Sequence, residues 1–196
     1  MRISPEEWNS LDLRTHGFLK GVALLDVWAV DLPYGPKNLT LLDLKDILSE
    51  RVIGSSPVVR FLVELRKLLG RILGWEKEQE LKDPPSDFRD RISTADREAS
   101  MVPMGTADGP FEPFRVLYVF PRESASEIWN ATVHAILSYA LIEKAKGYRL
   151  YWAVYVRPVG RLTKPYLIMI EPFRRLIVYP SIFRSIYSAW MRRYHG

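Results

Sequence analysis

The stretch GRLTKPYLIMIEPFRRLIVYPSIFR, residues 160–184, decides how this chain is organised. Its longest uncharged runs, PYLIMI and LIVYPSIF, are far shorter than the roughly 20 apolar residues that a membrane-spanning helix needs, and Glu171 and two arginines lie near its centre. Apolar side chains instead recur at three- and four-residue steps, at Tyr166, Ile170, Phe173 and Ile177. The stretch therefore predicts a long packed C-terminal helix that begins near Thr163, and no membrane span.

Two prolines inside this helix predict that it is not straight. Pro172 and Pro180 each remove a backbone hydrogen bond, so the helix should bend or break unless the fold uses the bend. Glu171 lies four residues before Arg175, a spacing that favours an ion pair along one helix face. A bent terminal helix of this kind suits packing against a curved β-sheet.

The N-terminal part predicts one strand followed by two short helices. ALLDVWAVDLP, residues 23–33, is rich in strand-forming side chains and ends at a proline. Thr40 and Asp43 form a weak capping-box pattern for a helix that ends near Glu50. A second amphipathic helix should follow Ser56 and end at Gly74.

Residues 76–113 are polar, contain many prolines and glycines, and show no useful periodicity, so they predict a long loop or lid. Period-two patterns then predict antiparallel strands. RVLYVFP gives one strand, and residues 127–143 give either one strongly bent strand or two strands with a turn near His134. EKAKG predicts a hairpin into the last strand, YRLYWAVYV.

The amino-acid composition limits the kinds of chemistry that this chain can carry out. Cysteine is absent and the three histidines are far apart in the chain, so we expect no disulfide, no metal centre and no cofactor. The beginning of the sequence has no apolar run typical of a signal peptide, and we expect a cytoplasmic protein. One glutamine, no cysteine and 14 prolines suggest a thermophilic source. The length fits a single domain over residues 1–196.

Positive charge is concentrated at the C-terminal end. Residues 157–196 contain eight Lys or Arg and one acid, Glu171, which gives this segment a net charge of +7 within a total of +5. No nucleic-acid recognition motif accompanies the charge, so we do not expect nucleic acid as a partner. The oligomeric state is not predictable from these features.

The predicted order of elements is similar to that of the helix-grip architecture of the START-like, or birch-pollen-allergen-like, superfamily (SRPBCC). The segments SEIWNATVHAILSYALIE and YRLYWAVYVRPVGRLTKPYLIMIEPFRRLIV also resemble the bacterial domain-of-unknown-function family 2867. Arg174 stands where that family tends to have histidine, and LTKPY inserts residues. The resemblance implies an α+β fold with a curved antiparallel sheet wrapped around the C-terminal helix, and a cavity between them.

Side chains with an aromatic body and a polar tip suit such a cavity and a hydrophobic or aromatic small molecule. The predicted lining is Trp129, His134, Tyr139, Trp152, Tyr155, Tyr166, Ile170 and Phe173. An enzyme of cyclase, lyase or hydrolase type would use His134 as its acid or base, close to Glu127 or Glu171. The third alternative is an interaction module that uses the basic C-terminal helix.

Overall fold

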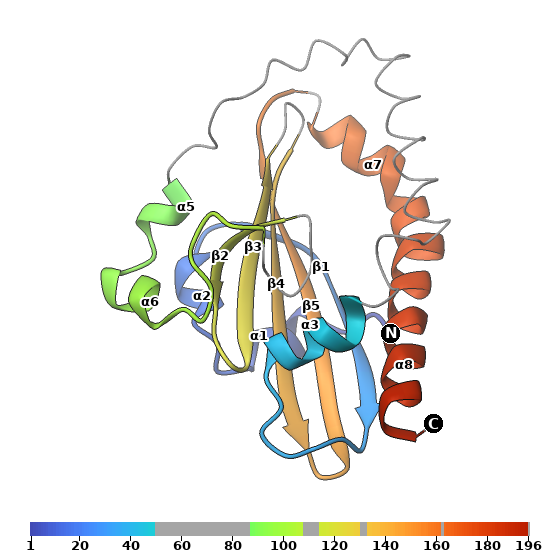
Figure 1. Ribbon diagram of the computed structural model, residues 1–196. Helices are drawn as coiled ribbons and strands as arrows, with labels where there is room; N and C mark the ends of the chain where they lie inside the picture. The colour runs from blue at the N-terminus through green and yellow to red at the C-terminus, as the bar shows by residue number, and fades with distance from the viewer. Residues whose placement is uncertain (50–86, 108–113, 130–132, 162, 196) are drawn as a thin grey trace.

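The protein is described by a computed structural model that covers residues 1–49, 87–107, 114–129, 133–161 and 163–195. It is a mixed α+β structure in which an antiparallel sheet of five strands lies beside a long C-terminal helix (Figure 1). The strands run in the spatial order β1-β5-β4-β3-β2. Their bounds are Ala23–Pro33 for β1, Arg115–Val119 for β2, Glu123–Trp129 for β3, Val133–Lys144 for β4 and Gly147–Pro158 for β5.

The predicted hairpin between the last two strands is confirmed. Lys144 of β4 pairs with Gly147 of β5, so two residues form the turn. Gly147 has φ +131°, and a Cβ atom at this position would lie 2.2 Å from the carbonyl oxygen of Leu32 on β1. Only glycine fits here, because both the backbone conformation and the neighbouring strand exclude a side chain.

The region 127–143 forms two strands, as in the second of the two alternatives. β3 ends at Trp129 and β4 begins at Val133, with Trp129 paired to His134 across the hairpin. The change of strand therefore falls before His134. Because this change breaks the alternation between odd and even positions, Trp129 lies on the same face of the sheet as His134.

The C-terminal helix consists of α7 (Thr163–Phe173), a π-helical segment η1 (Arg174–Val178) and α8 (Tyr179–His195). The prolines at 172 and 180 lie on either side of η1, and α7 leans away from the axis of α8 (Figure 1). The bend that the prolines predict is thus present, but the helix is continuous. A widened π turn is one way in which a helix takes up such a defect.

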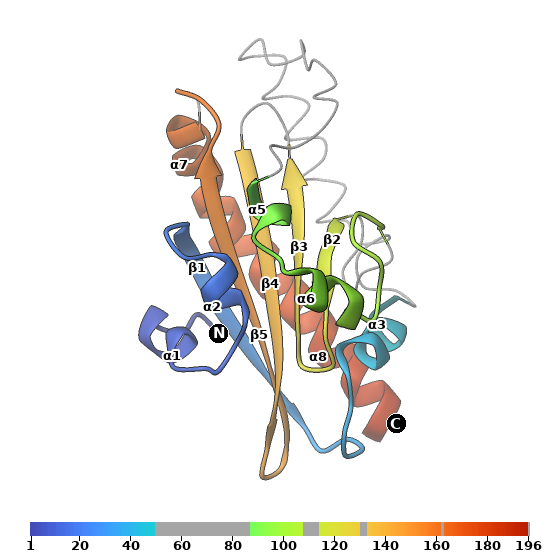
Figure 2. The same cartoon turned by 90° about the vertical axis from the view of Figure 1, so that its left-hand side faces the viewer.

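The sheet is buried on both faces. We call the face toward the C-terminal helix the α8 face, and Figure 2 shows that helix behind the sheet. On it Trp28, Tyr139 and Trp152 share one core with Phe183 and Trp190 of α8. The opposite face, which we call the α2 face after the helix α2 (Thr15–Phe18), is covered by short helices from other parts of the chain. This double burial explains why β4 and β5 are apolar at nearly every position.

The short helices of the N-terminal part are α1 (Pro5–Asn9), α2 (Thr15–Phe18) and α3 (Leu41–Ser49). The capping box before α3 is confirmed: the amide of Thr40 donates to Asp43 Oδ2 at 2.8 Å and the amide of Asp43 donates to Thr40 Oγ1 at 3.3 Å. The second predicted helix, over residues 57–73, lies outside the described residues.

The prediction that residues 76–113 lack regular structure is wrong for residues 87–99. They contain α5 (Asp87–Asp90) and α6 (Thr94–Ala99). Ser93 caps α6 by accepting a hydrogen bond from the amide of Asp96 at 3.1 Å. Helices of four and six residues are too short to produce a recognisable hydrophobic period, so the sequence pattern missed them.

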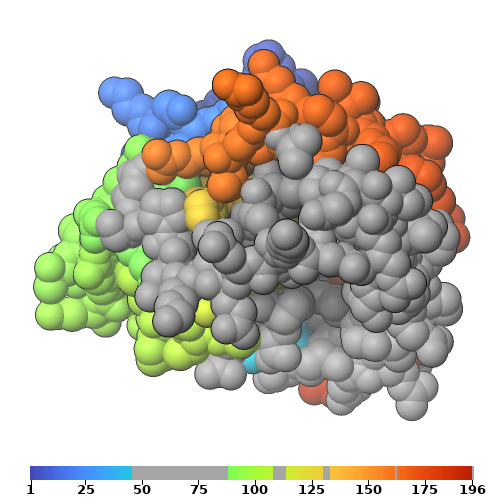
Figure 3. All heavy atoms as spheres, turned by 90° about the horizontal axis from the view of Figure 1, so that it is seen from above, coloured from blue at the N-terminus to red at the C-terminus, as the bar shows by residue number. Residues whose placement is uncertain are grey.

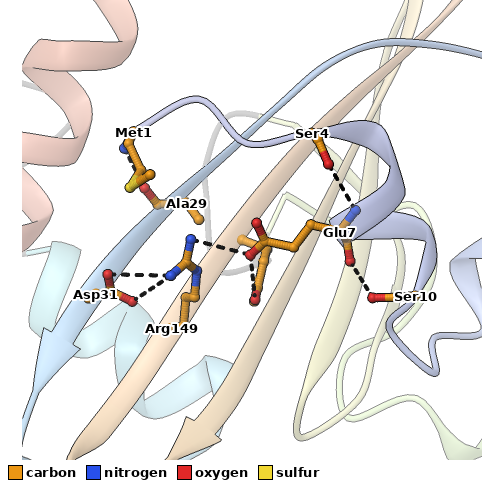
Figure 4. A network of polar contacts seen from close by, with 8 residues as sticks. Met1, Ser4, Glu7, Ser10, Ala29, Asp31 and Arg149 are labelled. Atoms are coloured by element: carbon orange, nitrogen blue, oxygen red, sulfur yellow. Dashed lines mark hydrogen bonds and ion pairs between the residues drawn. The ribbon is translucent and has the colours of Figure 1, made fainter.

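A surface network fixes α1 to the α2 face (Figure 4). Arg149 of β5 forms ion pairs with Glu7 of α1 and with Asp31 of β1, both at 3.2 Å. Tyr151 donates a hydrogen bond to Glu7 Oε1 at 3.2 Å. Within the described ranges, no helix is long and apolar enough to cross a membrane.

Candidate functional site

Polar side chains lie in a row across the α8 face, beneath the C-terminal helix. Ser124 on β3 pairs with Tyr139 on β4, Tyr139 with Trp152 on β5, and Trp152 with Trp28 on β1. All four residues are at most 9 % exposed. Direct cross-strand neighbours stand about 5 Å apart on one face, so these four side chains, each with a hydroxyl or an indole N–H, stand side by side and form a polar band across the sheet.

The next row on the same face adds a second serine and an acid. Ser126 on β3 and Asp26 on β1 lie at its two ends, with Leu137 and Val154 between them. Ser126 is 0 % and Asp26 is 4 % exposed. A core of this size would ordinarily be built from apolar side chains, so two adjacent rows with polar ends require an explanation.

Several polar atoms of these rows have no hydrogen-bond partner among the described residues. They are Ser124 Oγ, Ser126 Oγ, Trp28 Nε1 and Asp26 Oδ1, all buried. Burying a polar group without a partner costs about 1–3 kcal/mol, and most buried polar groups in proteins are paired. The α8 face thus presents both hydrogen-bond donors and acceptors that no described residue pairs with.

An ion pair links this face to the helix. Arg174 Nη2 contacts Asp26 Oδ2, and the side chains are 14 % and 0 % exposed. The Arg174 guanidinium carbon lies 5.7 Å from the ring centroid of Tyr179, and Tyr179 packs against Trp28 with ring centroids 4.9 Å apart. Burial raises the pKa of the Tyr179 phenol well above its usual value, and the Asp26 carboxylate raises it further while Arg174 lowers it. The phenol is therefore neutral and can donate a hydrogen bond.

Two irregularities of the backbone meet at this ion pair. A β-bulge interrupts the pairing of β1 with β5 between Leu24 and Asp26. Arg174 is the first residue of the π-helical segment. Both β-bulges and π turns are enriched at functional sites, where they aim a side chain that a regular element would direct elsewhere.

The α2 face carries a different buried cluster around His134. The Nε2 atom of His134 lies 3.0 Å from Glu127 Oε2, and Arg89 of α5 donates to Glu127 Oε1 from Nε at 3.0 Å and from Nη2 at 2.7 Å. Burial would raise the pKa of Glu127, but hydrogen bonds from His134 and Arg89 outweigh it and hold that pKa below its ordinary value. The predicted proximity of His134 to Glu127 is confirmed, whereas Glu171 pairs with Arg175.

The geometry of this cluster favours a structural role for His134. Its side chain is 0 % exposed, with the rings of Phe88 and Trp129 set edge-on at 4.8 and 4.9 Å. Phe88 and Arg89 both belong to α5, so the cluster fixes that short helix to the sheet. A general acid or base has to reach its substrate directly or through one water, which this enclosed imidazole does not do in the present conformation.

The sheet divides the predicted lining residues into two groups. Tyr139, Trp152 and Tyr166 belong to the core of the α8 face, whereas Tyr155 belongs to the core of the α2 face together with Trp8, whose Nε1 donates to its hydroxyl at 2.7 Å. Trp129 and His134 also lie on the α2 face. Ile170 and Phe173 lie on α7 and are half-buried. The eight side chains therefore do not line one cavity.

The prediction placed these residues in one cavity wrongly for two reasons. Both concern the alternation of side chains between the two faces of the sheet. Trp152 and Tyr155 are three residues apart on one strand, so they must point to opposite faces. Trp129 and Tyr139 are ten residues apart, so a single continuous strand would place them on the same face. The change of strand between them places them on opposite faces. Tyr139 and Trp152 of the α8 face were predicted, but Ser124, Ser126 and Asp26 were missed, although Asp26 has a sequence signal as an acid inside an otherwise apolar strand.

These features define a class of α+β protein: an antiparallel sheet with a long C-terminal helix on one face and a buried polar band between them. The chain belongs to the family described as protein of unknown function (DUF2867), whose model matches residues 18–181. Comparisons with curated proteins and with solved structures gave no match.

Proposed function

We propose that the α8 face binds a small hydrophobic or aromatic molecule that carries hydroxyl or carbonyl groups, held between the sheet and the C-terminal helix. The observation that carries the proposal is the set of buried polar atoms without a partner, in two adjacent rows beside the Asp26–Arg174 ion pair. Trp28 Nε1 offers a donor, Asp26 Oδ1 an acceptor, and each serine hydroxyl both. We propose further that the fold, with its antiparallel sheet beside a long C-terminal helix, is a helix-grip fold of the START-like superfamily.

The surroundings of these atoms fit a ring-bearing ligand. Phe183 of α8 is in ring contact with both Trp28 and Trp152, with ring centroids 6.1 and 6.0 Å apart. Aromatic walls with a small number of placed polar groups are typical of sites for small molecules. The ion pair supplies a fixed charge at one end of the band, next to the neutral Tyr179 phenol.

The first experiment is mass spectrometry of the protein purified under native conditions. We expect a stoichiometric apolar compound with at least one hydroxyl or carbonyl group. If the protein is isolated without ligand, titration with the fluorescent probe 1-anilinonaphthalene-8-sulfonate measures binding to apolar surface, and the serine variants below test whether that surface is the α8 face. A protein that carries no compound, binds no probe and gains no thermal stability from a library of aromatic metabolites contradicts the proposal.

Serine substitutions separate a binding site from a plain core. Ser124→Ala and Ser126→Ala each remove a buried hydroxyl that has no partner among the described residues, so each should stabilise the ligand-free protein, by up to about 1–3 kcal/mol. Both should weaken ligand binding, because the ligand loses a hydrogen bond. This pairing of higher stability with weaker binding is expected of residues retained for function.

Ser138→Ala is the matched control. Ser138 is equally buried, but it lies on the α2 face and donates a hydrogen bond to Thr15 Oγ1 at 2.9 Å. Its removal should lower stability by about 1 kcal/mol and leave binding unchanged. If the two α8-face variants behave as Ser138→Ala does, the serines are ordinary core residues and the proposed site is wrong.

An enzyme remains the alternative through His134, which is paired with Glu127 and whose buried Nδ1 atom has no hydrogen-bond partner among the described residues. His134→Ala tests it separately, since turnover of a co-purified compound would collapse in an enzyme while binding on the opposite face would persist.

A further inference from the structure

The outward side of α7 and η1 is apolar and exposed. We call the outer stripe the four residues Ile168, Pro172, Leu176 and Ile177, the first three of which follow one another at four-residue steps along the helix. Ile168 is 70 %, Leu176 77 % and Ile177 41 % exposed. The space-filling view in Figure 3 shows the orange segment that includes α7 at the surface of the molecule. Exposed apolar residues gathered on one helix face mark an interaction surface.

Basic side chains flank the outer stripe. Arg161 and Lys164 are exposed at the start of the helix, and Arg184 is exposed on α8 beyond its other end. The one acid of residues 157–196, Glu171, is already paired with Arg175. Three exposed cations thus stand near the stripe, and within the described part of residues 157–196 the one acid is already paired.

This combination fits an anionic membrane surface. Helices that lie in a membrane interface bury an apolar side to the depth of the acyl chains and place Lys and Arg among the headgroups. Each basic residue near an anionic leaflet contributes attraction of about 1 kcal/mol. A membrane needs no complementary groove to bind one projecting side of a helix, because the lipid surface adapts to the shape of the helix.

A second copy of the chain is a poorer occupant. In a symmetric dimer each surface meets itself, so the same basic residues of two copies would be brought together around the stripe. Like charges placed opposite one another oppose association. The charge pattern thus disfavours self-association through this surface.

We propose that the outer stripe docks the protein on an anionic membrane surface, with Ile168, Leu176 and Ile177 at the level of the acyl chains and with Arg161, Lys164 and Arg184 among the headgroups. This inference is independent of the ligand site on the α8 face. It concerns the outward side of the helix, whereas the ligand site uses the side that holds Arg174 against Asp26.

Vesicle flotation tests the proposal with the full chain. We expect binding to phosphatidylcholine vesicles that contain about 30 % phosphatidylglycerol, weak or no binding to pure phosphatidylcholine, and a loss of binding as salt screens the charges. The variant Ile168→Asp with Leu176→Asp should lose binding by about tenfold or more. Because both side chains are largely exposed, this variant should keep the melting temperature of the original protein.

Two further variants complete the test. Lys164→Glu with Arg184→Glu should also reduce binding by at least about tenfold, since reversing two charges changes an attraction of about 1 kcal/mol each into a repulsion. Met101→Asp is the control, because Met101 is 44 % exposed and lies outside the helix, and it should bind as before. Equal binding to neutral vesicles, or unchanged binding of both double variants, overturns the proposal. A dimer in light scattering that the Ile168 and Leu176 variant abolishes overturns it in favour of a second copy.

Discussion

The ion pair between Asp26 and Arg174 yields a prediction of definite size. Replacing Arg174 with Met removes the cation and leaves the Asp26 carboxylate, with a side chain 0 % exposed, without its partner. Removing one member of a buried ion pair typically destabilises a protein by about 3–5 kcal/mol. For a chain of this length each kcal/mol corresponds to a change in melting temperature of about 2–4 °C, so Arg174→Met should lower it by roughly 6–20 °C.

The assay is urea unfolding followed by tryptophan fluorescence, with two comparison variants. Adding Asp26→Asn to Arg174→Met removes the isolated charge and should recover at least about 2 kcal/mol of the loss. The adjacent Arg175→Met is the control, since its partner Glu171 is 39 % exposed and such pairs contribute about 0–1 kcal/mol. A loss below about 1 kcal/mol for Arg174→Met, or strict additivity with Asp26→Asn, would refute the reasoning.

Two further predictions concern pH and glycine. Burial raises the pKa of Glu123 although the amides of Arg14 and Thr15 donate to it, whereas the pKa of Glu127 is lowered. The folded state therefore gains stability from Glu123 as pH falls toward 4.5 and loses the contribution of Glu127 as pH falls below that value. Urea unfolding between about pH 3 and 7 should show that Glu123→Gln and Glu127→Gln change the pH dependence in opposite directions, and a change of the same sign contradicts the assignment. Gly147→Ala should lower stability by more than about 2 kcal/mol, because its Cβ would overlap the Leu32 carbonyl, and a variant that melts within a few degrees of the original would show that the hairpin can shift.

Local patterns predicted most of the elements correctly, because each depends on residues that are close in the chain. The strand at residues 23–33, the capping box of Thr40 and Asp43, and the hairpin at EKAKG are confirmed. The terminal helix is confirmed too, because its three- and four-residue repeat is a local pattern. The repeat was wrong for Ile177, which it placed on the packed side and which is 41 % exposed. Period and capping chemistry are local properties, so they survive without knowledge of the tertiary structure.

The candidate site was harder to predict, because it depends on which strands are neighbours. The row from Ser124 to Trp28 joins residues that are almost a hundred positions apart, and it appears only when β1 is known to pair with β5. The β-bulge that places Asp26 on the α8 face leaves no mark in the sequence. The π-helical segment that presents Arg174 to it is equally unmarked, apart from the prolines on either side.

The π-helical segment also sets how far α7 is rotated about the helix axis relative to α8. Each residue of an α-helix turns the chain by about 100°, so one residue more or fewer within Arg174–Val178 rotates α7 by that angle relative to α8. Deleting one residue there would give a more regular helix, but it would turn Arg174 away from Asp26 and move Ile168 out of its outward position. The irregular turn therefore acts as a phase adjustment that lets one helix present an inward cation and an outward apolar stripe at the same time.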